Sequence, residues 1–371
     1  MGALIYIEMR KKLIPWAKPA LFGLEKKYVV KALSSSWISG GPFVLKLENL
    51  FKKKFNTKYA FAVSNGTSAL HLAFLSIGLK SGDEIVVPGF GYMAAANIAK
   101  LMNLKVIFSD VNKNTFCVDL ENLKKVISKK TKAVVTINTY GNVHDLDKIK
   151  KYLSKRKIMF VEDAAESLGS KFKNKLSGTF GDIGTFSFHA TKNIVTGEGG
   201  MVITNNSKLA KKISLYRSHG VLKERYKHHV HGHNFRLTNL QAAIGVAQFK
   251  NLNKIIYKRK KIYEWYLSLI DKNKLLLQKI LDNSNVVPWT IAIFLKKSLI
   301  ASRAKIMRDL LKKNIETRNG FYSADRLKIF KTNKNLLNSN SLSKNIICLP
   351  FYYDMKKKDV NEICSKLNEL I

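Results

Sequence analysis

Three short segments in the first two thirds of the chain carry side chains that could do chemistry together. The first, residues 64–70 (SNGTSAL), places a glycine-bearing turn between an apolar run and a helical pattern. Such a turn offers free backbone N–H groups and the positive end of a helix dipole, and both bind phosphate. A plain turn capped by Ser64 or Asn65 is the alternative interpretation of the same residues.

The other two segments supply an acid and an amine. Glu162 and Asp163 end an apolar run in residues 160–170 (FVEDAAESLGS), at the strand end where a parallel sheet collects ligands. A buried carboxylate there needs a partner such as a protonated ring nitrogen, unless Asp163 only caps the next helix. Lys192 follows an apolar, aromatic run in residues 184–200 (GTFSFHATKNIVTGEGG). A partly buried lysine is a nucleophile toward carbonyls, and this lead-in distinguishes Lys192 from solvated lysines.

A phosphate site, a strand-end carboxylate and an imine-forming lysine together match the requirements of pyridoxal 5′-phosphate (PLP). This cofactor acts as an electron sink, while the protein supplies the lysine and an acid that pairs with the pyridinium nitrogen. The sequence therefore predicts a PLP enzyme with Lys192 as the nucleophile and Asp163 as the acidic partner.

The elements around these segments alternate between strand and helix through the first two thirds of the chain. This order predicts an α/β fold with a mostly parallel, doubly wound sheet covered on both faces, and antiparallel or irregular pairing after Gly169. We expect a leader at residues 1–14, a large domain at 15–250 and a smaller C-terminal α+β domain at 251–371. The predicted strands are 59–63, 84–88, 105–110, 132–140, 157–163 and 286–295, and the predicted helices are 43–55, 94–102, 119–129, 145–154, 251–270 and 302–313.

The net charge of +39, from 65 basic against 26 acidic residues, first suggests nucleic acid or an anionic membrane surface as a partner. Only 10 of the basic residues are arginine, the residue that reads nucleic acid best, and the lysines are spread along the chain. We therefore expect a solvated lysine surface without a specific nucleic-acid partner, and keep a basic nucleic-acid-binding protein as the less favoured alternative.

Two further compositional features narrow the class of protein. No apolar run approaches the roughly 20 residues of a membrane span, so we expect no membrane partner. Cys117, Cys348 and Cys364 are far apart and form no CxxC pair, which indicates neither a disulfide framework nor a metal site. Unpaired cysteines fit a cytoplasmic location.

The chain resembles a known family in motifs that run in the same order from about Ile14 to Gln248. The motifs SNGTSALHLA, PGFGYMAAAN, EDAAESLGS, GDIGTFSFHATKNIVTGEGGMV, RSHG and GHNFRLTNLQAAIG resemble those of the DegT/DnrJ-type sugar aminotransferases. EDAAESLGS and TGEGGM resemble the GDP-perosamine synthase branch, and FHATK resembles enzymes that make 3-amino or 4-amino sugars on dTDP and UDP carriers. The resemblance implies the PLP-dependent transferase fold of aspartate aminotransferase (fold type I) and a homodimer with shared active sites.

The resemblance also implies roles for matching residues. Lys192 would form the internal aldimine with PLP and then move the proton between substrate and cofactor, and Asp163 would keep the pyridine nitrogen protonated. The cofactor-binding residues would further include Gly66, Thr67 and Ser187 at the phosphate, Tyr92 on the ring face, Glu166 near the ring hydroxyl, and Asn234 from the neighbouring subunit. The candidate substrate-binding residues are His189, His219, Arg236, Arg318 and Tyr322. For His189, a buried core histidine is an equally open interpretation.

The function implied is the transfer of an amino group from an amino acid, expected to be L-glutamate, to a nucleotide-linked sugar. The acceptor would be a 4-keto-6-deoxy or 3-keto sugar, reached through pyridoxamine phosphate, in amino-sugar synthesis for a surface polysaccharide such as O-antigen. Lys192 favours this over dehydration, because the sugar 3-dehydratase branch carries histidine at that position. A catalytically silent PLP or sugar-nucleotide sensor on the same fold is the alternative.

The chain also departs from the family pattern at three places. Residues 88–91 read PGFG where relatives commonly carry PSFT, and Val143 and His144 replace a proline and a small residue. Thr317-Arg318 leads into residues 319–322 (NGFY), whereas perosamine-type enzymes often carry proline and histidine there. Relatives often contact the sugar nucleotide with this last loop, so the particular sugar stays open there.

Overall fold

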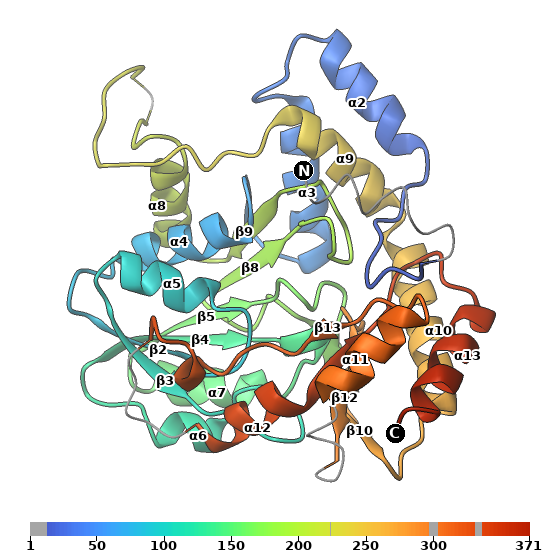
Figure 1. Ribbon diagram of the computed structural model, residues 1–371. Helices are drawn as coiled ribbons and strands as arrows, with labels where there is room; N and C mark the ends of the chain where they lie inside the picture. Colours follow the sequence, from blue (N-terminus) through green and yellow to red (C-terminus); the bar gives the residue numbers. More distant parts are fainter. Residues whose placement is uncertain (1–12, 223, 297–302, 331–335) are drawn as a thin grey trace.

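The computed structural model describes residues 13–222, 224–296, 303–330 and 336–371. Residues 1–12 of the predicted leader therefore lie outside the described residues. The main sheet has seven strands in the order β1-β9-β8-β5-β4-β2-β3 (Figure 1). Their bounds are β1 (Tyr59–Val63), β2 (Glu84–Pro88), β3 (Lys105–Ser109), β4 (Thr131–Ile137), β5 (Met159–Asp163), β8 (Ile183–Ser187) and β9 (Gly200–Thr204).

The directions of the strands bring their carboxyl ends to one edge. β2 is parallel to β3 and β4, and β4, β5 and β8 continue the parallel series. β9 is antiparallel to both β8 and β1, so β1 points the same way as β8. This confirms the expected mostly parallel sheet with an antiparallel side after Gly169. The loops that follow β1, β2, β4, β5 and β8 therefore all emerge at the same edge.

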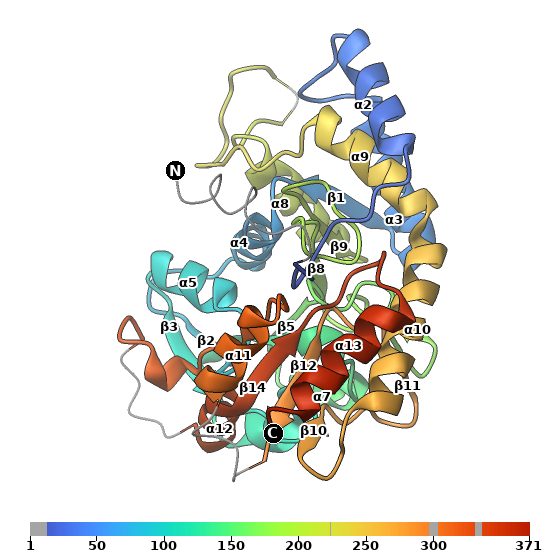
Figure 2. The same ribbon diagram turned by 45° about the vertical axis from the view of Figure 1, so that its right-hand side comes forward.

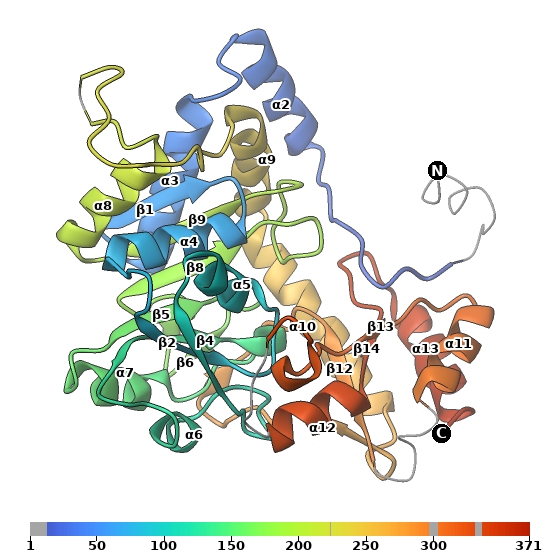
Figure 3. The same cartoon turned by 60° about the vertical axis from the view of Figure 1, so that its left-hand side comes forward.

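Helices cover both faces of this sheet. Successive residues of a strand point to opposite faces, so each strand packs against both layers of helices. In β2, Ile85 and Val87 pack in the core under α4, α5 and α8, whereas Val86 packs in the core under α6 and α7. Helices α3 and α9 cover the far end of that second face, and Figure 3 shows α4 and α5 in front of the sheet. The bounds are α2 (Leu24–Ser34), α3 (Pro42–Phe55), α4 (Gly66–Ile77), α5 (Ala94–Leu101), α6 (Leu120–Lys124), α7 (Leu146–Ser154), α8 (Ser207–Arg217) and α9 (Asn239–Lys250).

A second, antiparallel sheet is built from the C-terminal third of the chain, in the order β10-β12-β14-β13. It shares an apolar core with α10, α11 and α13. Figure 2 shows these helices beside β12 and β14. Asn251 separates α9 from α10, close to the predicted domain boundary at residue 250, and the division itself stays a prediction. The bounds are β10 (Leu275–Leu277), β12 (Ile291–Leu295), β13 (Arg318–Asn319), β14 (Ile346–Leu349), α10 (Leu252–Leu269), α11 (Arg303–Lys312), α12 (Leu337–Asn345) and α13 (Lys357–Asn368).

The N-terminal segment and a small third sheet link these parts. Ile14 pairs with Ile315, and the carbonyl of Trp16 accepts the N–H of Phe351, so the start of the described chain lies on the C-terminal part. The small sheet has the order β11-β6-β7 and joins the segment before β12 to the loop after β5. Its strands are β6 (Lys171–Phe172), β7 (Lys175–Leu176) and β11 (Ser284–Asn285).

Three predicted elements are shorter than expected. The helix predicted over 119–129 is only the short α6, and the strand predicted over 132–140 ends with β4. Tyr140 adopts a left-handed backbone conformation (φ 59°) in the 3₁₀ turn that follows, which no strand could contain. The strand predicted over 286–295 begins only with β12, because Pro288 has no N–H to give to a sheet.

Across the described ranges, none of the helices combines the length and apolar character that crossing a membrane requires.

Candidate active site

The carboxyl ends of β1, β2, β4, β5 and β8 border a cavity of about 680 Å³. The segments of the sequence that could do chemistry, far apart along the chain, therefore meet at one place. Eight of the predicted site residues line this cavity: Gly66, Thr67, Tyr92, Asp163, Glu166, Ser187, His189 and Lys192.

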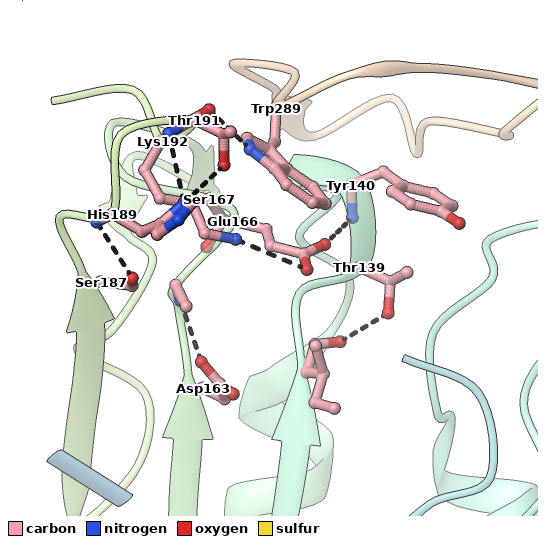
Figure 4. A network of polar contacts seen from close by, with 12 residues as sticks. Thr139, Tyr140, Asp163, Glu166, Ser167, Ser187, His189, Thr191, Lys192 and Trp289 are labelled. Atoms are coloured by element: carbon pink, nitrogen blue, oxygen red, sulfur yellow. Dashed lines mark hydrogen bonds and ion pairs between the residues drawn. The ribbon is translucent and has the colours of Figure 1, made fainter. Parts of the chain in front are cut away.

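Lys192 lies opposite a buried carboxylate in this cavity (Figure 4). Its Nζ is 3.8 Å from Oε1 of Glu166, and the backbone N–H of Tyr140 donates to the other Glu166 oxygen at 2.7 Å. Burial raises the pKa of Glu166 to about 7, although the charge of Lys192 lowers it. Burial likewise lowers the pKa of Lys192, which the two acids raise. An acid with a raised pKa therefore lies beside an amine with a lowered pKa, so the two pKa values are closer to each other than in water.

An aromatic ring covers the same amine. Nζ of Lys192 lies 3.7 Å from the centre of the Trp289 ring, and Nε1 of Trp289 donates to the carbonyl of Thr191 at 2.8 Å. The Thr191 hydroxyl bonds Nδ1 of His189 at 3.0 Å. The His189 side chain is 46% exposed, which contradicts the alternative of a buried core histidine.

The two adjacent carboxylates of β5 face opposite sides of the sheet. Asp163 borders the cavity, its Oδ1 accepts the N–H of Ala165 at 3.0 Å, and burial raises its pKa to about 6. Glu162 points away and accepts the backbone N–H groups of Gly178 and Phe180 at 2.6 and 2.8 Å. Its partners are thus structural, and Asp163 is the carboxylate available to a ligand.

The opposite end of the cavity is formed by the start of α4. Asn65 is the N-cap, since its side chain accepts the N–H of Ser68 at 2.8 Å, as the capped-turn interpretation expected. The next N–H groups, of Gly66 and Thr67, belong to the first helical turn, which has no acceptors within the helix. A Cβ added to Gly66 would lie 2.9 Å from Cβ of Ser187, so only glycine leaves this approach open. The helix dipole favours an anion at this end.

Five predicted residues do not line the cavity of a single chain. Asn234, His219 and Arg236 are exposed on the segment that follows α8. Arg318 forms an ion pair with Glu316 at 2.6 Å, and Tyr322 is 49% exposed.

Other residues line the cavity without having been predicted. Trp16 and Trp289 form an edge-to-face pair with ring centres 5.6 Å apart, and Phe321 stacks beside Trp289. His71 lies on α4 and burial lowers its pKa to about 4, so it is neutral at pH 7. His71 is four residues after Thr67, a spacing that puts both side chains on the same face of a helix. In contrast, nothing in the sequence connected the two tryptophans to the site.

Among the described residues, no group of three or more histidine, cysteine, aspartate or glutamate side chains is arranged to hold a metal ion.

A family model for the DegT/DnrJ/EryC1/StrS aminotransferases matches residues 21–368. The chain belongs to this family. It is 36% identical over 364 residues to a GDP-perosamine synthase of Escherichia coli O157:H7, covering 96% of this chain and 98% of that protein. Its enzyme class is therefore that of an aminotransferase, and its cofactor is PLP.

Solved structures support the fold of this family member. The Helicobacter pylori aminotransferase PseC, involved in the biosynthesis of pseudoaminic acid, superposes with a TM-score of 0.92 at 26% identity, covering 97% of this chain and 99% of that one. An E. coli GDP-4-keto-6-deoxy-D-mannose-3-dehydratase with bound hydrated PLP has a TM-score of 0.89 at 29% identity, covering 95% and 99%. The predicted fold of PLP-dependent transferases is thus confirmed.

The residues of this aminotransferase fit PLP. The opening between Gly66 and Ser187, at the start of α4, suits a phosphate group because a Cβ would close it. The buried Asp163 needs a cationic partner, which a protonated pyridine nitrogen supplies. Lys192 presents its amine in the same cavity, so the phosphate, the ring nitrogen and the aldehyde of the cofactor each have a counterpart.

Proposed function

We propose that the protein transfers an amino group from L-glutamate to a nucleotide-linked 4-keto-6-deoxy or 3-keto sugar. One observation carries this proposal: the amine of Lys192, the carboxylates of Asp163 and Glu166 and the anion site at Gly66 border one cavity. The use of the product in surface polysaccharide synthesis, and a cytoplasmic location consistent with three unpaired cysteines, belong to the same proposal.

The proposed roles follow from what each residue can do. When bound, PLP supplies an electron sink that weakens the C–H bond next to the transferred nitrogen. Lys192 takes up that proton at Nζ and returns it, because burial keeps its pKa below that of a solvated lysine. Asp163 holds a proton on the ring nitrogen, and Glu166, fixed by the N–H of Tyr140, keeps Nζ oriented toward the cavity. Ser187, Thr67 and the first N–H groups of α4 hold the phosphate.

The nucleotide-sugar class is supported by the relatives and by the walls of the cavity. The relative in E. coli is a GDP-perosamine synthase, and the chain matches it over nearly its whole length. Tyr92, Phe321 and Trp16 give the cavity aromatic walls, on which the apolar face of a sugar or a base can pack. The presence of Lys192, where the dehydratase branch carries histidine, supports transamination.

We further propose a homodimer in which Asn234 of each subunit reaches the cofactor phosphate of the other. Asn234 is exposed and lies outside the cavity of its own chain, which this arrangement requires. Large apolar side chains are also exposed near that segment and at the start of the chain, as an interface between two copies would need: Trp37, Ile38, Leu45, Leu222 and Tyr226.

The proposal is tested by separating the two half reactions. The PLP-loaded protein is treated with L-glutamate, freed of amino acid, and then mixed with a panel of GDP-, UDP- and dTDP-linked keto sugars. Glutamate is expected to bleach the visible band of the cofactor, and one keto sugar is expected to restore it. Bound cofactor with no response to any keto sugar would contradict the proposal and favour the sensor.

A further inference from the structure

Trp289 is fixed on several sides, although the function proposed above gives it no role. It lies in the segment between β11 and β12, and its indole N–H donates to the carbonyl of Thr191, the residue before Lys192. The edge-to-face contact with Trp16 holds the ring from another side. The face of the ring is 3.7 Å from Nζ of Lys192.

Arg259 of α10 fixes the backbone of the same segment from behind. Its Nε donates to the carbonyl of Pro288 at 3.0 Å, and one terminal nitrogen donates to the carbonyl of Trp289 at 2.7 Å. Arg259 is 5% exposed, its guanidinium carbon lies 4.5 Å from the ring centre of Phe351, and it forms no ion pair with the acids of the described ranges. A buried charge that bonds only backbone carbonyls restricts how that backbone can move.

We propose that Trp289 is a positioning residue for Lys192, and that Arg259 acts on Lys192 through Trp289. The ring attracts the ammonium by its quadrupole and limits the rotamers of a long, flexible side chain. The indole N–H also anchors the backbone from which Lys192 starts. The inference rests on the proposed role of Lys192 as the amine that reacts with the cofactor.

The groups around Lys192 indicate in which direction the loss of the Trp289 ring changes the pKa of the amine. Burial, the largest influence on the amine, disfavours its protonated form, whereas the two acids that face it, Glu166 and Asp163, favour that form. On its own segment, His189 bonds Thr191 rather than the amine. Replacing Trp289 by methionine, a long apolar side chain that still covers the amine, keeps both acids and the burial in place and removes the quadrupole. The Lys192 pKa should then fall.

The test measures the Lys192 pKa directly, in the full-length protein freed of cofactor. The rate at which acetic anhydride acylates Lys192 is followed against pH by peptide mass spectrometry. Trp289→Met is expected to lower this pKa by about half a unit to one unit, the size of one cation–π contact. Trp289→Phe keeps a ring and is expected to stay near the wild-type value.

A matched pair in the same molecule controls for general effects. Lys258 lies 4.9 Å from the ring centre of Trp265 on α10, and neither residue lines the cavity. Trp265→Met is expected to leave Lys192 unchanged, and Trp289→Met to leave Lys258 unchanged. An unchanged or raised Lys192 pKa in Trp289→Met would overturn the proposal.

Arg259 gives a second, independent variant in case Trp289→Met does not fold. Arg259→Met is expected to lower the Lys192 pKa in the same direction, because the segment that carries Trp289 loses two donors. Arg259→Lys, which keeps a charged donor, should restore part of the shift. A folded Arg259→Met protein with the wild-type Lys192 pKa would overturn the part of the proposal that concerns Arg259. The acylation assay needs no substrate, so a wrong substrate assignment does not affect its outcome.

Discussion

At the scale of single residues, the contrast between Asp163 and Glu162 is the sharpest feature of the site. Both are buried neighbours on β5, but only Asp163 borders the cavity, whereas Glu162 bonds backbone N–H groups. The sequence showed two adjacent acids at a strand end. The alternation of a strand placed them on opposite faces, and packing decided which face holds the ligand.

This contrast predicts opposite outcomes for two conservative substitutions. Asp163→Asn should fold and bind cofactor but lose turnover by about 100-fold, because a neutral amide cannot stabilise a protonated ring nitrogen. Glu162→Gln should instead destabilise the fold by about 1–3 kcal/mol, since backbone donors lose a charged acceptor. Urea unfolding and turnover per folded molecule measure the two effects. Equal effects of both variants on turnover would contradict the assignment.

A second prediction concerns the pH dependence of stability that Glu166 causes. Burial raises its pKa from an ordinary 4.5 to about 7 in the folded state. The folded protein therefore keeps a proton that the unfolded chain has lost, and the free energy of unfolding decreases as pH rises from about 4.5 to 7. Glu166→Gln removes this contribution. As pH rises from 5 to 8, we expect the free energy of unfolding of the variant to increase relative to that of the cofactor-free wild type, by on the order of 2 kcal/mol.

Urea titrations of both proteins at these two pH values measure that gain. Parallel pH dependence of the two proteins would show that Glu166 ionises normally.

At the scale of elements, the start of α4 against β8 forms the anion site. Gly66→Ala places a Cβ 2.9 Å from Cβ of Ser187, so the helix start must shift away from the phosphate. We expect the affinity for PLP to fall roughly tenfold, about 1.4 kcal/mol, with the affinity for unphosphorylated pyridoxal unchanged. Gly40→Ala is the matched control, because a Cβ there meets no atom within 4 Å. Equal loss for both ligands would place the phosphate elsewhere.

The same scale shows what the sequence could and could not predict. The strands and the mostly parallel character of the sheet could be predicted from apolar runs, turn residues and the alternation of strand and helix, because these signals are local; the order of the strands was not predicted. The segments at the strand ends also carried Lys192 and Asp163 as recognisable types. Trp16 and Trp289 were not predicted, because they reach the cavity from distant parts of the chain and only tertiary packing brings them together. The left-handed Tyr140 was missed for the same reason, since its conformation is held by Glu166.

At the scale of the whole molecule, the proposed dimer predicts complementation between inactive subunits. Lys192→Ala removes the amine of its own site, and Asn234→Ala removes a contact to the partner's site. A mixed dimer contains one site with both residues intact. Unfolding and refolding an equal mixture should therefore restore roughly a quarter of wild-type activity, as expected for two-fold pairing at random. Each variant refolded alone is the control, and no recovery would contradict a shared site.

The net charge of +39 also belongs to this scale. A positive field raises the encounter rate with anionic nucleotide sugars, and salt screens it. We expect kcat/KM for the sugar nucleotide to fall as ionic strength rises, while kcat stays constant. A neutral viscogen at matched viscosity is the control, and a kcat/KM that ignores salt would leave the charge without a role in encounter.

The central claim is that Lys192, of the 55 lysines in the chain, carries the amino transfer. The most direct test compares wild type with Lys192→Ala for turnover of L-glutamate and the keto-sugar nucleotide that restores the cofactor band. We predict that the variant loses the visible band of the lysine-bound cofactor and at least about 1,000-fold in turnover, because both the nucleophile and the proton carrier are gone. A Lys192→Ala protein that keeps full turnover would contradict the account.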